Sequence, residues 1–321
     1  WACWRWRGAS ADALLHTGAV MAPVWYNDLM ALRFVLLVPA CGIALYAASL
    51  PAAVLLHDTF DGPALSSLWQ RGAWMLGRTQ LGASISFSNE AGVSFVSLPL
   101  HTYNPNQPGV YLYGAEIYSL QNFPRGDGLM AEARVRQRTE VRGMVSSLFG
   151  YRYLSNVADE LDFEFLINTA SNQLLLTQWN DWDYSGQNGS RYFNNTNHHS
   201  VMIANGVINR TQWTVLRFFW LPDVTIWEAN GVELYRSAHA QPDAPMPIRA
   251  NFWAPNSEWA DAYDYFLRPV SSPSNNAVYW YDIDYITVAE VPEPAALPGG
   301  AAVCSIAHLF VHRPRRRLHG T

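Results

Sequence analysis

The feature that most constrains the fold is a strict two-residue alternation between Asp159 and Leu166, near the middle of the chain. Acidic and apolar side chains fall on opposite sides of this stretch, in the order Glu160, Leu161, Asp162, Phe163, Glu164 and Phe165. The period predicts a β-strand with one face in a hydrophobic core. The other face is unlike an ordinary solvated strand face, because three carboxylates on it repel one another.

Repulsion of this kind is typical of a chemical site, because clustered acids push one another's pKa values apart. At about 3.3 Å per residue, the Cα atoms of Glu160 and Glu164 are expected roughly 13 Å apart. Two Glu side chains that lean together bring their carboxyl groups to about 5–5.5 Å, the separation in retaining glycosidases. Asp162, between them, can hydrogen-bond the nucleophile. An acidic surface strand and a Ca²⁺ site built from oxygen ligands are the alternatives.

The Glu-x-Asp-x-Glu pattern of Glu160, Asp162 and Glu164 resembles the signature of glycoside hydrolase family 16. That family contains laminarinases, lichenases and xyloglucan endotransglycosylases, and the resemblance extends over residues 55–290. It implies an all-β fold, a concanavalin A-like jelly-roll β-sandwich of two antiparallel sheets. It also implies that Glu160 is the nucleophile, that Asp162 assists it, and that Glu164 is the acid/base. Glu164 is expected to stay protonated near neutral pH because Glu160 and Asp162 are ionised beside it.

Residues 55–290 are independently predicted to be β-structure. Short alternating segments are separated there by Gly, Pro and Asn clusters, with no long helical pattern, which is typical of a β-sandwich or barrel. The clearest hairpin signal is Asn230-Gly231, which lies between the apolar segments 224–227 and 232–234.

Composition excludes several function classes. The chain has no Lys, so a Schiff-base lysine and a Walker A loop are both excluded. Residues 55–290 contain 14 Arg against 23 Asp and Glu, a formal charge of −9, which disfavours a nucleic-acid partner. All three Cys lie outside this region, which therefore has no disulfide and no Cys-based zinc site.

The N-terminal part of the chain predicts export. Residues 1–29 are interpreted as an over-extended gene start, with Met30 as the true start. Residues 30–53 have a short basic region, an apolar run and small residues, which together predict a cleaved signal peptide. A membrane anchor and a lipoprotein signal at Cys41 are the alternatives.

The C-terminal segment 291–321 is predicted to be a separate module. Val291-Pro292-Glu293-Pro294 precedes an apolar stretch and an Arg-rich end. This arrangement resembles a PEP-CTERM sorting signal of Gram-negative bacteria, which implies an exosortase-type partner and a transient membrane contact. The alternative is an ordinary C-terminal anchor. The expected location is therefore extracellular or on the cell surface of a Gram-negative bacterium.

The resemblance also assigns residues that contact the sugar, since a glycan site needs aromatic platforms and amide or hydroxyl groups. These candidates are Tyr151, Asn180, Trp182, Asn251 and Trp253. For each aromatic residue, a place in the core is the competing interpretation. No cofactor is expected to be required for catalysis. A structural Ca²⁺ is a further possibility, with Asp284 at the matching position.

Two features depart from the family pattern. The position before Asp159 is Ala158, where the family often has an aromatic residue or His, so substrate preference cannot be copied across. The Asn-rich loop 186–199 ends in His198-His199, which we interpret as exposed residues rather than metal ligands.

The leading hypothesis is an exported, endo-acting, retaining β-glycanase. A transglycosylase would use the same chemistry with a sugar acceptor in place of water. A non-catalytic glycan-binding surface protein is the alternative from another class, because sandwiches of this kind also serve as lectins. The intact acidic triplet disfavours the last of these.

Overall fold

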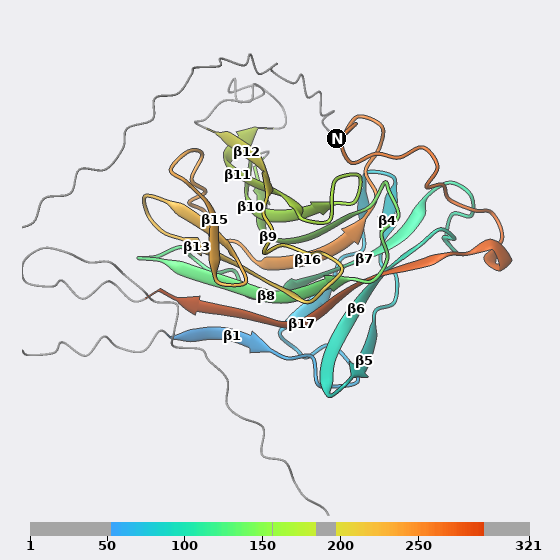
Figure 1. Cartoon of the computed structure of the whole chain (residues 1–321), viewed down its shortest axis with the longest axis horizontal. Coiled ribbons are helices and arrows are strands. Elements are labelled where there is room, and N and C mark those ends of the chain that lie inside the picture. Colours follow the sequence, from blue (N-terminus) through green and yellow to red (C-terminus); the bar gives the residue numbers. More distant parts are fainter. Residues whose placement is uncertain (1–52, 156, 184–196, 292–321) are drawn as a thin grey trace, which may run out of the picture. The chain divides into compact units, whose positions relative to one another are not determined.

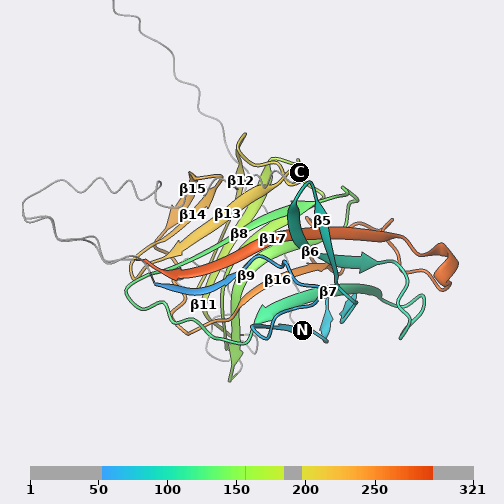
Figure 2. The same cartoon turned by 90° about the horizontal axis from the view of Figure 1, so that it is seen from below.

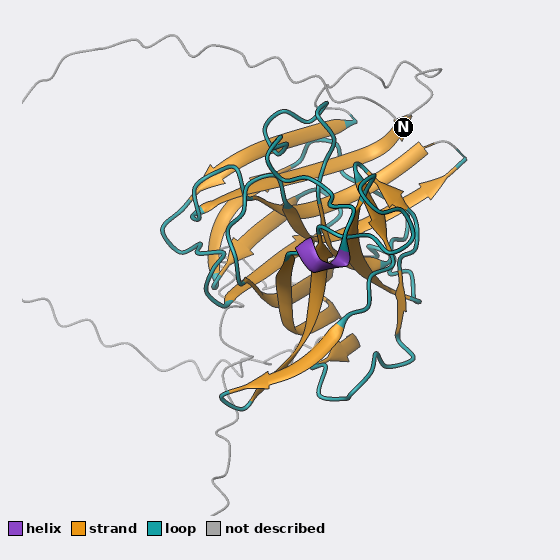
Figure 3. Cartoon of the chain, turned by 90° about the vertical axis from the view of Figure 1, so that its right-hand side faces the viewer, coloured by secondary structure: helices purple, strands orange, loops and turns teal. Residues whose placement is uncertain are grey.

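The computed structural model of this 321-residue chain describes residues 53–155, 157–183 and 197–291. The expected gene start, nearly all of the signal peptide, most of the Asn-rich loop and nearly all of the sorting tail lie outside these residues. Where the structure is described, no helix is long and apolar enough to cross a membrane. Regular structure there is strand apart from one short 3₁₀ helix, η1 (Pro273–Asn275), drawn in purple in Figure 3.

One sheet carries the acidic triplet, and we call it the acidic sheet. In spatial order its strands are β12 (His198–Ala204), β11 (Gln173–Asp183), β10 (Val157–Leu166), β9 (Val145–Leu154), β16 (Ile248–Trp253), β7 (Leu112–Ser119) and β2 (Trp69–Arg71). All of these pairings are antiparallel. The triplet therefore lies on a strand with neighbours on both sides.

The second sheet carries rows of paired charges on its outer face, and we call it the ion-pair sheet. Its main strands, in spatial order, are β15 (Val232–Ser237), β14 (Thr225–Ala229), β13 (Thr214–Trp220), β8 (Leu129–Gln137), β17 (Val278–Glu290), β6 (Val93–His101) and β5 (Ser86–Glu90). The edge of β17 that pairs with β6 also pairs with β1 (Val54–Asp58). Figure 2 shows β17 running beside β8, with β13 beyond it.

The two sheets are layered as a sandwich, which confirms the predicted all-β jelly-roll class. In Figure 1, β9, β10 and β16 form one layer and β8, β17 and β1 form the other. Strand β7 belongs to both sheets, because its first residues pair with β4 (Thr79–Leu81) and β6 and its later residues pair with β16. The β4–β7 pairing is parallel, a local departure from the expected antiparallel pattern, and β3 (Met75–Leu76) closes a small hairpin with β4.

The apolar side of the acidic strand forms the core, as its alternation predicts. Leu161, Phe163 and Phe165 are at most 1% exposed. Phe163 packs against Phe218 of β13, with ring centroids 6.2 Å apart, so this contact joins the two sheets. Because the side-chain period of a strand is two, burying this face directs Glu160, Asp162 and Glu164 to the opposite face.

A β-bulge interrupts the register between β10 and β11 just before the triplet. Ala158 pairs with Trp182 and Glu160 pairs with Trp179, so the two strands are out of step by one residue at Asp159. Asp181 has a φ of 50° there, and its backbone N–H donates to the buried Asp159 carboxylate at 2.8 Å. That carboxylate also accepts from the N–H groups of Asp243 and Ala244. Asp159 therefore fixes the bulge and is not part of the acidic face.

The predicted hairpin at Asn230-Gly231 is confirmed. The two residues join β14 to β15, with φ values of 51° and 78°. A tight hairpin turn requires positive φ at both positions, and Asn and Gly tolerate it better than other residues.

Candidate active site

The acidic triplet lies in the middle of the acidic sheet and on a single face of it. Glu160 and Glu164 are half-buried and Asp162 is 3% exposed. None of the three forms a salt bridge with any residue that the structure describes. Three carboxyl groups that form no salt bridge with any described residue therefore lie together on one face, which is the main chemical feature of this sheet.

Each acid has one neighbour on β9 and one on β11, and directly paired residues share a face. These neighbours are Tyr151 and Trp179 beside Glu160, Phe149 and Thr177 beside Asp162, and Ser147 and Leu175 beside Glu164. The triplet is thus bordered by aromatic rings at one end and by hydroxyl groups at its centre and other end.

Burial raises the pKa of all three carboxyl groups, and that of Glu164 to about 8. Repulsion from Glu164 adds to the rise in pKa at Glu160 and Asp162. Burial, and not the charge of its neighbours, is the main cause at Glu164, which corrects the cause expected from the sequence.

Interactions that favour an ionised carboxylate are concentrated on two of the three acids. The positive charge of Arg249 lowers the pKa of Glu160, and hydrogen bonds from Thr177 lower that of Asp162. Glu164 has a single long hydrogen bond, 3.4 Å from Ser147 Oγ. Among the described residues, neither a cation nor a short hydrogen bond favours an ionised Glu164.

Arg249 is a site residue that the sequence did not reveal. It lies on β16, where it forms an ion pair with the buried Glu116 of β7 at 2.9 Å. Its guanidinium group lies over the rings of Trp74, Tyr118 and Tyr151, 4.9 to 5.6 Å from their centroids. Ion pairing and cation–π contacts hold this cation in place on the acidic face.

The structure brings three of the predicted sugar contacts onto the acidic face. Tyr151 is directly opposite Glu160, and Asn251 is opposite Ser147, in the same row as Glu164. Trp253 lies two residues further along β16 and packs against Trp259, with centroids 5.8 Å apart. Asn251 Oδ1 and Trp253 Nε1 are buried without a hydrogen-bond partner among the described residues, which is unusual for buried polar atoms.

The other two predicted contacts, Asn180 and Trp182, are affected by the bulge. Trp179, and not Asn180, is opposite Glu160, so Asn180 is one residue out of step with this face. Trp182 is on the face, but it is 6% exposed and packs against Trp179, Ala158 and Tyr151. A direct sugar contact by either residue stays a prediction.

The expected exposure of the His pair is wrong for His198, which is 6% exposed. Its ring is 6.0 Å from the Trp179 ring and 5.9 Å from the Trp182 ring, centroid to centroid. The neighbouring His199 is half-buried, stacks on Tyr235 and lies 2.9 Å from its hydroxyl. Both residues lie on β12 and begin the strand, whereas the loop before them was the expected setting.

No protein-family model and no curated protein matches this sequence, but solved structures match its fold. The β-glucanase of Bacillus licheniformis superposes with a TM-score of 0.56 at 18% identity, over 75% of this chain and 100% of that chain. A glycoside hydrolase family 16 endo-glucanase from Bacteroides ovatus gives a TM-score of 0.56 at 11% identity, over 73% and 99%. This chain has the fold of family 16 glycoside hydrolases.

A third solved structure that resembles this chain in fold is described differently. It is an immunostimulatory antigen and pseudo-β-1,3-glucanase of Mycobacterium tuberculosis, with a TM-score of 0.53 at 18% identity, over 74% of this chain and 99% of that chain. Proteins with this family 16 fold thus include one whose description denies the usual activity. Activity has to be argued from the residues of the site.

Asp284, the candidate residue for a structural calcium site, already forms an ion pair with an arginine. It lies on the ion-pair sheet, at a bulge in β17, and its carboxylate is 2.7 Å from Arg134 Nη1. A guanidinium group at that distance already neutralises the carboxylate and repels a cation. Calcium at Asp284 stays a prediction, and it would require Arg134 to move away.

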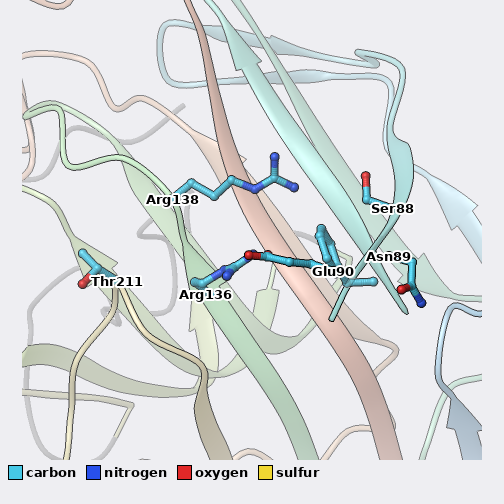
Figure 4. A pocket seen from close by; sticks show the side chains of 7 residues that line it. Ser88, Asn89, Glu90, Arg136, Arg138 and Thr211 are labelled. Atoms are coloured by element: carbon cyan, nitrogen blue, oxygen red, sulfur yellow. The ribbon is translucent and has the colours of Figure 1, made fainter. Parts of the chain in front are cut away.

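A pocket of about 490 Å³ lies on the ion-pair sheet, away from the triplet. Ser88, Asn89, Glu90, Phe95, Arg136, Arg138 and Thr211 line it. Figure 4 shows Arg136 beside Glu90, which it contacts at 2.7 Å. Within the pocket Glu90 pairs with Arg136, and Arg138 pairs with the buried Asp282 beneath it, so none of the charged residues that line it lacks an ion pair.

Proposed function

We propose that this protein is an endo-acting β-glycan hydrolase that works with retention of configuration. Glu160 is the nucleophile, Asp162 assists it, and Glu164 is the acid/base. One observation carries the proposal: three carboxyl groups that form no salt bridge with any described residue share one face of a family 16 fold. Such an arrangement lowers the stability of the fold, and a cost of this kind is typical of a functional site.

The distribution of supporting contacts suits these roles. Arg249 favours an ionised Glu160, which a nucleophile needs, and burial keeps a proton on Glu164, which an acid needs. Glu160 attacks the anomeric carbon while Glu164 protonates the leaving oxygen. Once Glu160 is esterified it no longer carries a charge. Glu164, now ionised, accepts a proton from the water or sugar hydroxyl that releases the product.

The acceptor that attacks the glycosyl-enzyme decides between hydrolysis and transglycosylation. Both reactions use the same triplet, and water is the default acceptor at a face that solvent can reach. A glycan-binding protein without turnover is a separate candidate, because one protein that shares this fold is described as a pseudo-β-1,3-glucanase. Binding of β-glucans with no new reducing ends at any pH would favour that candidate.

Two variants test the assignment. Glu160→Ala should abolish hydrolysis and, with azide and an activated donor, should yield a glycosyl azide of inverted configuration. Glu164→Ala should still form the intermediate from a substrate with a good leaving group, and azide should then give a product of retained configuration. Nuclear magnetic resonance of the products reads the configuration directly.

The substrate panel should contain β-1,3-glucan, mixed-linkage β-1,3-1,4-glucan, xyloglucan and galactan. Glu258→Gln serves as a matched control, since this acid lies in the β16–β17 loop and outside the triplet. Near-wild-type turnover by both triplet variants on every polymer that the wild type cleaves would remove Glu160 and Glu164 from the mechanism.

We further propose that the protein is exported, with removal of the first 50 or so residues and sorting through the C-terminal segment by an exosortase-type enzyme. The support comes from the sequence at both ends of the chain. Intact-mass measurement of the protein from its native host tests this proposal. An uncleaved product in the cytoplasm would contradict it.

A further inference from the structure

His198 is a buried titratable group near the triplet to which the proposed reaction gives no role. It is the first residue of β12 and pairs with Trp179, the residue opposite Glu160. Burial lowers the pKa of His198 to about 4, so its ring is neutral at ordinary pH. A neutral imidazole has one N–H donor and one acceptor nitrogen, so it can begin or end a hydrogen-bond chain.

A chain of hydroxyl groups connects the His198 ring to Asp162. His198 Nε2 is 3.1 Å from Ser200 Oγ, and Ser200 Oγ donates to Thr177 Oγ1 at 3.0 Å. Thr177 is directly opposite Asp162, and hydrogen bonds from its backbone N–H and from its side chain favour an ionised Asp162 carboxylate. The chain crosses three neighbouring strands, from β12 through β11 to β10.

In this series of hydrogen bonds, each group donates its proton to the next group in the direction of Asp162. Because the Ser200 hydroxyl proton is directed to Thr177, the Ser200 oxygen accepts from His198, which places the imidazole proton on Nε2. Thr177 accepts from Ser200, so its own proton is directed to Asp162. Hydrogen bonds aligned in this way polarise one another, and the last donor becomes a stronger one.

We propose that His198, Ser200 and Thr177 are positioning residues whose aligned hydrogen bonds orient Asp162 and favour its ionised form beside Glu160. The inference rests on the proposed function, because it concerns the acid that assists the nucleophile. Asp162 needs this support: it is 3% exposed, and its Oδ1 has no hydrogen-bond partner among the described residues. A carboxylate in that position would otherwise take up a proton.

Other charged and titratable groups around Asp162 do not supply the same support. They are Glu160 and Glu164 on its own strand, Tyr151 on β9, Arg249 on β16, Glu116 on β7 and His198 on β12. The two Glu residues oppose an ionised Asp162, and Arg249 acts on Glu160. Thr177 is the described side chain that favours a charged Asp162.

The first test is the pH dependence of kcat/KM for Thr177→Val and Thr177→Ser in the full chain. The active form has Asp162 ionised, and the form with one more proton does not, so loss of the hydroxyl destabilises only the active form. The acid limb of the profile should therefore move up by about one pH unit in Thr177→Val. Thr177→Ser keeps the hydroxyl and should retain the wild-type acid limb.

More distant links in the chain should have smaller effects in order. Ser200→Ala should move the acid limb by less than Thr177→Val, and His198→Leu by less again. His198→Gln, which keeps an N–H donor, should return the acid limb to its wild-type position.

Ser147→Ala is the matched control. The Ser147 hydroxyl contacts Glu164, so its loss should move the alkaline limb to higher pH and leave the acid limb in place. If Thr177→Val does not fold, the Ser200 and His198 series gives the same order.

The second readout does not depend on turnover. The carboxyl carbon of Asp162, labelled with ¹³C and assigned through Asp162→Asn, should titrate at higher pH in Thr177→Val than in the wild type. If this midpoint moves in a protein that cleaves no glycan, the proposed role of the hydrogen-bond series from His198 to Asp162, which we call the relay, is supported and the proposed function fails. If the wild type is active and neither the acid limb nor the midpoint moves, the relay is overturned.

Discussion

The two sheets carry their charges in opposite ways. On the ion-pair sheet, Asp282 is fully buried and contacts Arg136 at 3.0 Å and Arg138 at 2.7 Å. On the acidic sheet, Asp162 is equally buried but has no ion pair in the described part of the chain, and one of its oxygens has no hydrogen-bond partner there. The same chain thus satisfies a buried aspartate on one face and leaves another short of partners.

The difference distinguishes acids that stabilise the fold from acids that are free to take part in a reaction. Glu132 on the outer face is hydrogen-bonded by Arg217 and by the Tyr285 hydroxyl, so its charge is fully used within the fold. In the described part of the chain, Glu160 forms no salt bridge and is influenced by the charge of Arg249, and Glu164 has one long hydrogen bond. Groups that no internal partner satisfies are the ones a substrate can engage, and sites of this kind are usually functional.

The largest effect is expected on turnover. Glu160→Gln removes the nucleophile and should lower kcat/KM by roughly 10³-fold or more, with little change in melting temperature. Glu132→Gln is the matched change on the other sheet and should leave kcat/KM within about twofold, while it lowers the unfolding free energy by about 1–3 kcal/mol. Steady-state kinetics and thermal melts of both variants give the comparison. Equal losses of activity would erase the distinction between the two faces.

The second effect concerns stability, and here the variant on the ion-pair sheet should lose more than the variant on the acidic sheet. Asp282→Asn leaves two arginines without their buried partner and should cost roughly 3–5 kcal/mol. Asp162→Asn removes a poorly satisfied charge and should leave the unfolding free energy at pH 8 unchanged or raise it by up to about 1 kcal/mol. Urea titration measures both values. A cost of several kcal/mol for Asp162→Asn would show that the triplet contributes to the stability of the fold.

The third effect is a dependence of stability on pH. The folded state holds the Glu164 proton up to about pH 8, whereas the unfolded chain releases it near the ordinary value of 4.5. The folded state binds more protons between these values, so the unfolding free energy falls as pH rises through this window. Glu164→Gln has no such proton to lose. Its stability relative to wild type should therefore grow from pH 5 to pH 8, by about 2 kcal/mol after allowance for solvent at this half-buried side chain.

A urea series at several pH values tests this slope. Glu258→Gln, a change at the exposed Glu258 in the β16–β17 loop, is the control and should follow the wild-type curve. Parallel curves for Glu164→Gln and wild type would mean that Glu164 titrates normally in the folded protein.

Much of the local structure could be predicted from short sequence patterns. The alternation around Glu160 fixes a strand and the face its acids occupy, because a period of two depends only on the chain itself. The Asn230-Gly231 hairpin was equally predictable, since few residues adopt positive φ. The arrangement as a jelly-roll sandwich of two sheets was predicted from the resemblance to a family and not from these patterns.

The remaining site residues depend on tertiary structure. The bulge at Asp159 is held by N–H groups of Asp243 and Ala244, more than 80 residues away, and it shifts Asn180 out of step with Glu160. No periodicity marks such a position. Arg249 meets its partner Glu116 across strands β16 and β7, and His198 is buried by the two tryptophans of β11. Contacts between distant segments leave no local signal in the sequence.

The smallest effect is expected at Asp284, where the comparison between the two sheets is weakest. Its ion pair with Arg134 is partly exposed, with 32% of the arginine side chain and 16% of the aspartate side chain accessible. Arg134 also lies over the Trp213 ring, 5.1 Å from its centroid, so it keeps a partner when the pair is broken. Asp284→Asn should therefore lower the unfolding free energy by only about 0–1 kcal/mol.

Melting temperatures of wild type and Asp284→Asn, each with calcium and with a chelator, give the decisive measurement. If Arg134 holds this carboxylate, calcium shifts neither protein. If calcium stabilises the wild type and not the variant, the ion displaces Arg134, and Asp284 belongs with the incompletely satisfied acids and not with the paired ones.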